Sequence, residues 1–163
     1  MDRSMSIVSS PEGSIVVHSA TVIDGGETVH DAWVRIEAGV IVDRGVGATW
    51  SQADEVIDAV KAAGVGAILS PGLIDIHGHG GAGSSFDDGP EAIRAARALH
   101  REHGTTRAVV SLVTGTLDEL EHRVAEIAEL MATDTDILGS HLEGPFLDPG
   151  HHGAHAPALL REP

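Results

Sequence analysis

Two histidines separated by a single glycine, His77 and His79, are the first residues of the chain whose types and spacing could do chemistry. They end an apolar run at 67–76 that we expect to form a buried strand. Side chains alternate faces along a strand, so the two imidazoles should point the same way. Neutral imidazoles are common ligands of divalent metals, and this pair could supply half of a metal site. The alternative is a pair of exposed loop histidines beside a glycine-rich turn.

A second pair with the same spacing, His141 and Glu143, ends a predicted strand at 137–143. In βα barrels the catalytic groups lie at the C-terminal ends of parallel strands. Two imidazoles and one carboxylate form a common hydrolytic metal set, so we predict that His77, His79 and Glu143 bind a divalent metal from neighbouring strand ends. The role of His141 stays open: it could support a ligand from behind, face a substrate, or simply pack.

Three further histidines lie in a loop at 146–157 that is too rich in proline and glycine for regular structure. They could be ligands, substrate contacts or surface residues. We expect His151 and His152 to be exposed. His155 lies between small residues and close to Pro157, which suits a fixed position facing a substrate.

The elements that must position these residues alternate from residue 67 onwards. A helix is expected to start at the turn 88–91 and to stop at Gly104, followed by a strand at 107–113 and a second helix after a capping box formed by Thr116 and Glu119. Such alternation implies parallel strands joined by helical crossovers, which is an α/β arrangement. Before it, residues 14–42 read as antiparallel hairpins, and residues 43–66 have no clear assignment, with a short helix or a strand at 54–63.

Composition limits the partners. The formal net charge of −15 argues against nucleic acid and anionic membrane surfaces, although a phosphorylated small molecule needs only a few local donors. There is no cysteine, hence no disulfide and no thiolate metal site. Neither an apolar leader nor a long apolar run is visible, so we expect a soluble, cytoplasmic protein. The oligomeric state is open, a homo-oligomer included.

Two motifs resemble a known family. The sequence Pro-Gly-Leu-Ile-Asp-Ile-His-Gly-His-Gly at 71–80 is similar to the first barrel strand of the amidohydrolase superfamily, which dihydroorotases and allantoinases share. Leu-Glu-Gly-Pro-Phe-Leu at 142–147, followed by Gly-Ala-His-Ala-Pro at 153–157, resembles a narrower pattern, that of N-acetylglucosamine-6-phosphate deacetylases. The resemblance runs from about residue 14 to the end of the chain.

The resemblance implies a fold and an activity. The fold is a (β/α)₈ barrel beside a small β-sandwich built from both chain ends; residues 1–66 would be the N-terminal portion of the sandwich and residues 67–163 the first βα units of the barrel. The activity is hydrolysis of the acetamide of N-acetylglucosamine 6-phosphate to glucosamine 6-phosphate and acetate, with zinc or another divalent metal. Glu143 would be a metal ligand, His77 and His79 ligands of a further metal position, and Ala154 and His155 substrate contacts.

The family also supplies two more metal histidines and an aspartate acid/base from later strands. A complete barrel needs about 250 residues, so we expect the chain to be the N-terminal part of such an enzyme, with the catalytic acid/base aspartate beyond residue 163 and none in this chain. The competing interpretations are another metal amidohydrolase acting on a cyclic amide, and a non-catalytic metal-binding remnant.

Overall fold

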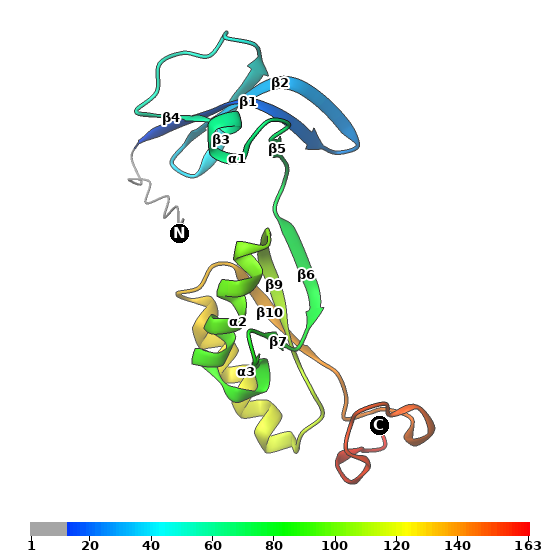
Figure 1. The fold of residues 1–163 in the computed structure, drawn as a ribbon. Helices are drawn as coiled ribbons and strands as arrows, with labels where there is room; N and C mark the ends of the chain where they lie inside the picture. Colours follow the sequence, from blue (N-terminus) through cyan, green and yellow to red (C-terminus); the bar gives the residue numbers. More distant parts are fainter. Residues whose placement is uncertain (1–12) are drawn as a thin grey trace. The chain divides into compact units, whose positions relative to one another are not determined.

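The structure is a computed structural model that describes residues 13–163, and it divides into two compact units, one ending at Pro71 and the other spanning Gly72–Pro163 (Figure 1). The division falls later than the boundary expected after residue 66. The reason is the short strand β5 (Ile68–Leu69), which pairs in parallel with β1 and so holds these residues in the first unit.

The first unit is a β-sheet with one short helix. Its remaining elements are β1 (Ser14–Asp24), β2 (Glu27–Glu37), β3 (Val40–Val46), β4 (Glu55–Asp58) and α1 (Ala59–Ala63). The sheet order is β3-β2-β1-β4, with the two hairpin pairings antiparallel, as predicted for residues 14–42. The stretch at 54–63 proves to be a strand followed by a helix, and Asp58 caps that helix.

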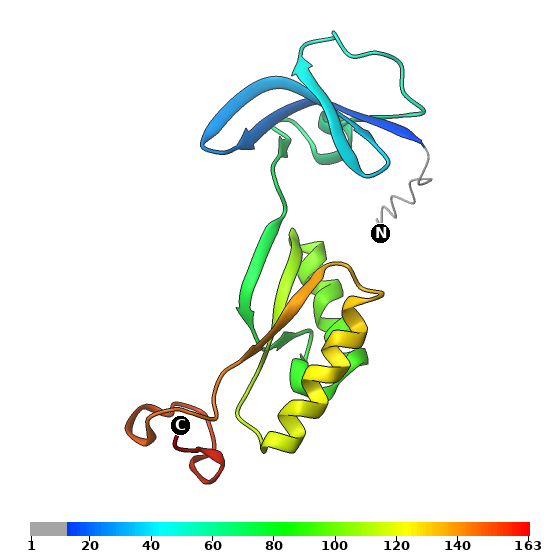
Figure 2. The same ribbon diagram turned by 180° about the vertical axis from the view of Figure 1, so that it is seen from behind.

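The second unit holds every residue predicted to do chemistry. Its elements are β6 (Leu73–Gly78), β7 (Gly80–Gly81), β8 (Ser84–Ser85), η1 (Phe86–Asp88), α2 (Pro90–Glu102), β9 (Thr105–Leu112), α3 (Leu117–Met131), β10 (Ile137–Leu142), η2 (Pro149–His151) and η3 (Pro157–Leu159). Strands β10, β9 and β6 form a parallel sheet in that order, and both views show α2 and α3 on one side of it (Figures 1 and 2). The α/β arrangement is therefore confirmed.

The core of this unit lies between the sheet and the two helices. It consists of Phe86, Ile93, Ala96, Val110, Leu112, Leu120, Ile127, Leu130 and Ile137. The central strand β9 contributes Val110 and Leu112, both fully buried. The capping box predicted at the start of α3 is present, with the Thr116 hydroxyl accepting from the backbone of Glu119 and the Glu119 carboxylate accepting from the backbone of Thr116. α2 begins with Pro90 after Gly89, without a side-chain cap.

Two expectations about the first parallel strand are wrong. The run at 67–76 is not one strand, because Ser70–Gly72 separates β5 from β6. Nor is it buried: Ile74 is 58% and Ile76 is 72% exposed. These residues belong to β6, an edge strand of the sheet, and in residues 13–163 no element packs over them.

The N-terminal ends of the parallel strands are closed by a buried ion pair. The guanidinium of Arg97 is 1% exposed and donates to the carboxylate of Asp136 and to the carbonyl of Thr105. Arg101 donates to the same carboxylate oxygen at 2.6 Å. Helix α2 is thereby tied to the start of β10, at the end of the sheet opposite the histidines.

Within the described residues, none of the helices has the length and apolar character that crossing a bilayer requires.

Candidate metal centre

Three predicted ligands converge at the C-terminal end of the parallel sheet. His77 is the penultimate residue of β6, His79 follows that strand, and Glu143 follows β10. Each offers one donor atom, and the three atoms lie within 4.8 Å of one another. We expected the two strands to be neighbours, but β9 lies between β6 and β10. Each crossover places a strand beside its predecessor, so the first and third strands flank the second.

The spacing of the donors fits a small divalent metal. The Nε2 atoms of His77 and His79 are 3.1 Å apart, and Glu143 Oε2 lies 3.5 Å from the first and 2.9 Å from the second. With metal–ligand distances near 2.0–2.2 Å, two donors at adjacent tetrahedral positions are roughly 3.3–3.5 Å apart. The three distances lie within this range or up to 0.4 Å below it, and the donor set of two nitrogens and one oxygen suits zinc.

The carboxylate of Glu143 is held in the form that binds metal. Partial burial raises its pKa, but the imidazoles of His155 and His79 lower it more, so the pKa of Glu143 lies below that of an ordinary glutamate. Oε2 faces His77 and His79, while Oε1 lies 3.5 Å from Nε2 of His155. Both oxygens of this carboxylate are therefore directed at imidazoles.

His141 does not join the three donors. Its Nδ1 lies 3.1 Å from the hydroxyl of Ser111, which is fully buried, and its ring meets that of His77 edge to face at 5.0 Å between centroids. Of the three roles considered for His141, the geometry favours contact with the ring of the ligand His77 rather than direct metal binding. His79 has less support: its Nδ1 is buried and has no hydrogen-bond partner in residues 13–163.

The loop after β10 places its histidines in contrasting surroundings. The side chain of His155 is 8% exposed and faces the carboxylate of Glu143, whereas Ala154 is exposed. The His151 side chain is 85% exposed and pairs with Asp148, as a surface residue would. His152, which we expected to be exposed, is half-buried. A cavity of about 230 Å³ is lined by Val113, Thr114, Ala154, His155 and Ala156.

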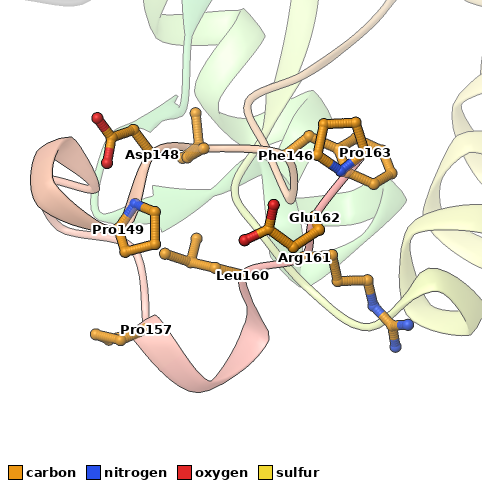
Figure 3. Close-up of a pocket in the computed structure, with 9 residues that line it drawn as sticks. Phe146, Asp148, Pro149, Pro157, Leu160, Arg161, Glu162 and Pro163 are labelled. Carbon is orange, nitrogen blue, oxygen red and sulfur yellow. The ribbon is translucent and has the colours of Figure 1, made fainter.

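A larger cavity of about 430 Å³ lies within the same loop but away from the three donors. Figure 3 shows its lining, which includes the carboxylates of Asp148 and Glu162, while the guanidinium of Arg161 points away from Pro149 and Pro157. The Glu162 carboxylate points among the lining residues and the Arg161 guanidinium does not, so this cavity does not suit a phosphate group.

Thr114 is the site residue that the sequence did not reveal. It lies just beyond β9, is 6% exposed, and its hydroxyl is within hydrogen-bond distance of both His155 Nδ1 and the backbone carbonyl of Glu143. A threonine between a strand and a capping box is indistinguishable in the sequence from an ordinary loop residue. Only the return of the 144–155 loop brings it to the site.

No protein-family model matches the chain. Among curated proteins, the chain is 39% identical over 103 residues to the N-acetylglucosamine-6-phosphate deacetylase of Danio rerio, a match that covers 58% of this chain and 25% of that protein. It is 34% identical over 148 residues to the Bos taurus enzyme of the same name, covering 86% of this chain and 35% of that protein. The N-acetylgalactosamine-6-phosphate deacetylase of Escherichia coli O157:H7 is 34% identical over 99 residues, 58% of this chain and 26% of that protein.

Solved structures of deacetylases are also similar to the chain. The Mycobacterium smegmatis N-acetyl-D-glucosamine-6-phosphate deacetylase, determined as a variant in complex with N-acetyl-D-glucosamine-6-phosphate, superposes with a TM-score of 0.77 at 37% identity, covering 92% of this chain and 38% of that one. The chain is similar to the N-terminal part of these deacetylases. The Pasteurella multocida enzyme, at 18% identity and a TM-score of 0.82, shows the shared fold alone. The chain spans about a quarter to two-fifths of the length of these relatives.

Proposed function

We propose that this chain supplies the first part of a metal-dependent N-acetylglucosamine-6-phosphate deacetylase. The observation that carries the proposal is the convergence of His77, His79 and Glu143 at one strand end, in a fold that matches the M. smegmatis enzyme with a TM-score of 0.77. The reaction hydrolyses the acetamide of the amino sugar and releases acetate.

The proposed fold is the first portion of a (β/α)₈ barrel. Helices α2 and α3 cover one face of the β10-β9-β6 sheet, and the edge strand β6 exposes apolar side chains at Leu73, Ile74 and Ile76. In a barrel this strand would pair with a further strand, and both of its faces would be covered, one by the packed interior and one by helices. Exposed apolar side chains on an edge strand support the barrel assignment, because an isolated three-stranded layer would favour polar residues there.

The residues at the strand ends have separate tasks. A divalent metal, zinc in the first instance, would be held by His77, His79 and Glu143 and would supply a Lewis acid for the amide carbonyl and for water activation. His141, tied to Ser111, orients the ring of His77. The acid/base aspartate implied by the resemblance belongs, in this proposal, to the part of the enzyme that these 163 residues do not include.

A chimera tests the proposal. Residues 13–163 would replace the matching segment of the M. smegmatis deacetylase, and acetate release from N-acetylglucosamine 6-phosphate would be measured together with metal content. We expect turnover, and we expect Glu143→Gln to abolish most of it with loss of metal, whereas Glu121→Gln on the exposed face of α3 should leave both unchanged. A folded, metal-loaded chimera that releases no acetate while the parent does would refute the proposal.

N-acetylgalactosamine 6-phosphate is the second candidate substrate. The similarity to the Escherichia coli O157:H7 protein of that name favours it, at an identity close to that of the vertebrate relatives. The two sugars differ only in the orientation of one hydroxyl group. Comparing kcat/KM for both in the same chimera decides between them, and ring opening of a cyclic amide in place of acetate release would point to a different amidohydrolase.

A further inference from the structure

Thr114 lies where the strand end, the loop and the metal centre meet. Its hydroxyl oxygen is 2.7 Å from Nδ1 of His155 and 3.1 Å from the backbone carbonyl of Glu143, and its backbone N–H donates to the same Nδ1 at 3.3 Å. The side chain is 6% exposed. Thr114 thus contacts both His155, which faces the Glu143 carboxylate, and the backbone of Glu143 itself.

The surroundings are built around this contact. A side chain at Gly144 would collide with the Thr114 hydroxyl, and Gly144 has a φ of +96°, a conformation that favours glycine. The preceding residue is fixed as well, because the backbone N–H of Val113 donates to Asp87 at 3.3 Å and Arg123 donates to the same carboxylate oxygen at 3.1 Å. Neither Thr114 nor the loop that meets it can move freely.

Two groups of Thr114, the backbone N–H and the hydroxyl, together decide which nitrogen of His155 carries the proton. A hydroxyl can rotate, but a backbone N–H cannot, and this one points at Nδ1 of His155. Nδ1 is therefore the acceptor, and the single hydroxyl proton of Thr114 is donated to Nδ1 at 2.7 Å rather than to the more distant carbonyl of Glu143. A neutral imidazole then has its proton on Nε2. Nε2 is the nitrogen that lies 3.5 Å from Glu143 Oε1.

We propose that Thr114 is a positioning residue that fixes the ring and tautomer of His155, so that its Nε2–H is directed at the carboxylate of Glu143. This inference deepens the proposed function and rests on it for its catalytic meaning. The result is a polar contact of 3.5 Å between the Nε2–H of His155 and Oε1 of Glu143, which stabilises the charged carboxylate and leaves Oε2 for the metal. The cavity beside Thr114 and His155 adjoins this arrangement.

The decisive measurement does not need activity. Imidazole nitrogen chemical shifts are recorded on the 163-residue chain without metal at alkaline pH, and His155 is assigned by the loss of its signals in His155→Gln. We expect Nδ1 to be the unprotonated nitrogen and Nε2 the protonated one. The opposite tautomer in the unmodified chain would overturn the proposal.

Variants then test the hydroxyl. Thr114→Val keeps the backbone N–H and the side-chain shape but removes the hydroxyl, which makes the shorter of the two contacts to Nδ1. The His155 signals should therefore move towards a mixture of tautomers, and Thr114→Ser should restore them. Thr116→Val removes a hydroxyl that caps α3 and should leave His155 unchanged. If Thr114→Val left the signals unchanged, or Thr116→Val moved them equally, the positioning role would be refuted.

The chimera separates this inference from the proposed function. Thr114→Val should lower kcat by about 10- to 100-fold at unchanged metal content, as loss of a residue that supports a ligand does. An inactive chimera in which His155 still shows the expected tautomer would count against the deacetylase, while an active chimera unaffected by Thr114→Val would count against Thr114.

Discussion

Replacing Asp136 with Asn tests the ion pair at the N-terminal end of the parallel sheet. One carboxylate oxygen of Asp136 accepts from Arg101 at 2.6 Å and from Arg97 at 3.2 Å. The Arg97 side chain is 1% exposed, and its Nε and Nη1 are buried with no partner in the described part of the chain. In that part, Asp136 is the only carboxylate paired with Arg97. Its removal therefore leaves a buried positive charge uncompensated.

The loss of stability expected for Asp136→Asn follows from the buried charge that remains on Arg97. Breaking a buried pair by deleting one partner costs about 3–5 kcal/mol, and Asn keeps a carbonyl acceptor, so we expect a loss of about 2–3 kcal/mol in the free energy of unfolding. Arg97→Met removes the buried charge itself, and Asp136 keeps Arg101, so that variant should lose only about 1 kcal/mol.

Urea unfolding measures both variants. Far-UV ellipticity reports mainly on α2 and α3 in the unit that contains the pair, while Trp33 and Trp50 are in the other unit, so their fluorescence is recorded in parallel. The midpoint of the ellipticity transition should fall more for Asp136→Asn than for Arg97→Met, at an unchanged m-value. The reverse order would refute the argument that Arg97 depends on this carboxylate.

The same pair predicts a pH dependence. Burial raises the pKa of Asp136, but the hydrogen bonds and charges of Arg101 and Arg97 outweigh it and hold the pKa below its ordinary value. A lowered pKa in the folded state stabilises the protein fully above the unfolded pKa of about 3.9 and no longer does so once the pH has fallen through the folded value. The stability difference between the unmodified chain and Asp136→Asn should hold from neutral pH to about pH 5 and then shrink.

Other perturbations have expected outcomes. Zinc at about 100 times its Kd should stabilise the second unit by about 2.7 kcal/mol in urea unfolding, and Glu143→Gln should remove most of that gain; equal stabilisation of both proteins would show that Glu143 is not a ligand. Gly144→Ala should destabilise by more than about 1 kcal/mol, through its left-handed backbone and the collision with Thr114, and a neutral effect would contradict the described packing. Thr116→Val should lower stability by about 1 kcal/mol in the same assay, since it removes the hydroxyl that accepts from Glu119, and no loss would mean that the cap contributes nothing.

Local patterns predicted much of the second unit. Alternation along a strand correctly placed His77 with His79 on one face, and the spacing of Thr116 and Glu119 correctly predicted the start of α3. The meeting of these histidines with Glu143 was also predictable, because the C-terminal ends of parallel strands share one edge of a sheet. Each of these inferences depends on residues close in sequence or on a rule of topology.

Features set by long-range pairing were not predictable in the same way. The division of the run at 67–76 depends on β5 pairing with β1, some 47 residues earlier at Thr21↔Ile68, and apolar residues alone do not reveal which sheet they join. The exposure of Ile76 depends on which elements cover the sheet. The contact between Thr114 and His155 depends on the path of a loop without regular structure.

The metal centre depends on a strand that contributes none of its three donors. β9 pairs with both outer strands, with Gly78 opposite Val110 and Leu142 opposite Leu112. Val110 and Leu112 are fully buried against the helices, so the register of β9 is fixed by the core. A slip of one residue in either pairing would turn the histidines or Glu143 to the opposite face of the sheet. Packing between β9 and the two helices thus determines the distance between ligands that come from different strands.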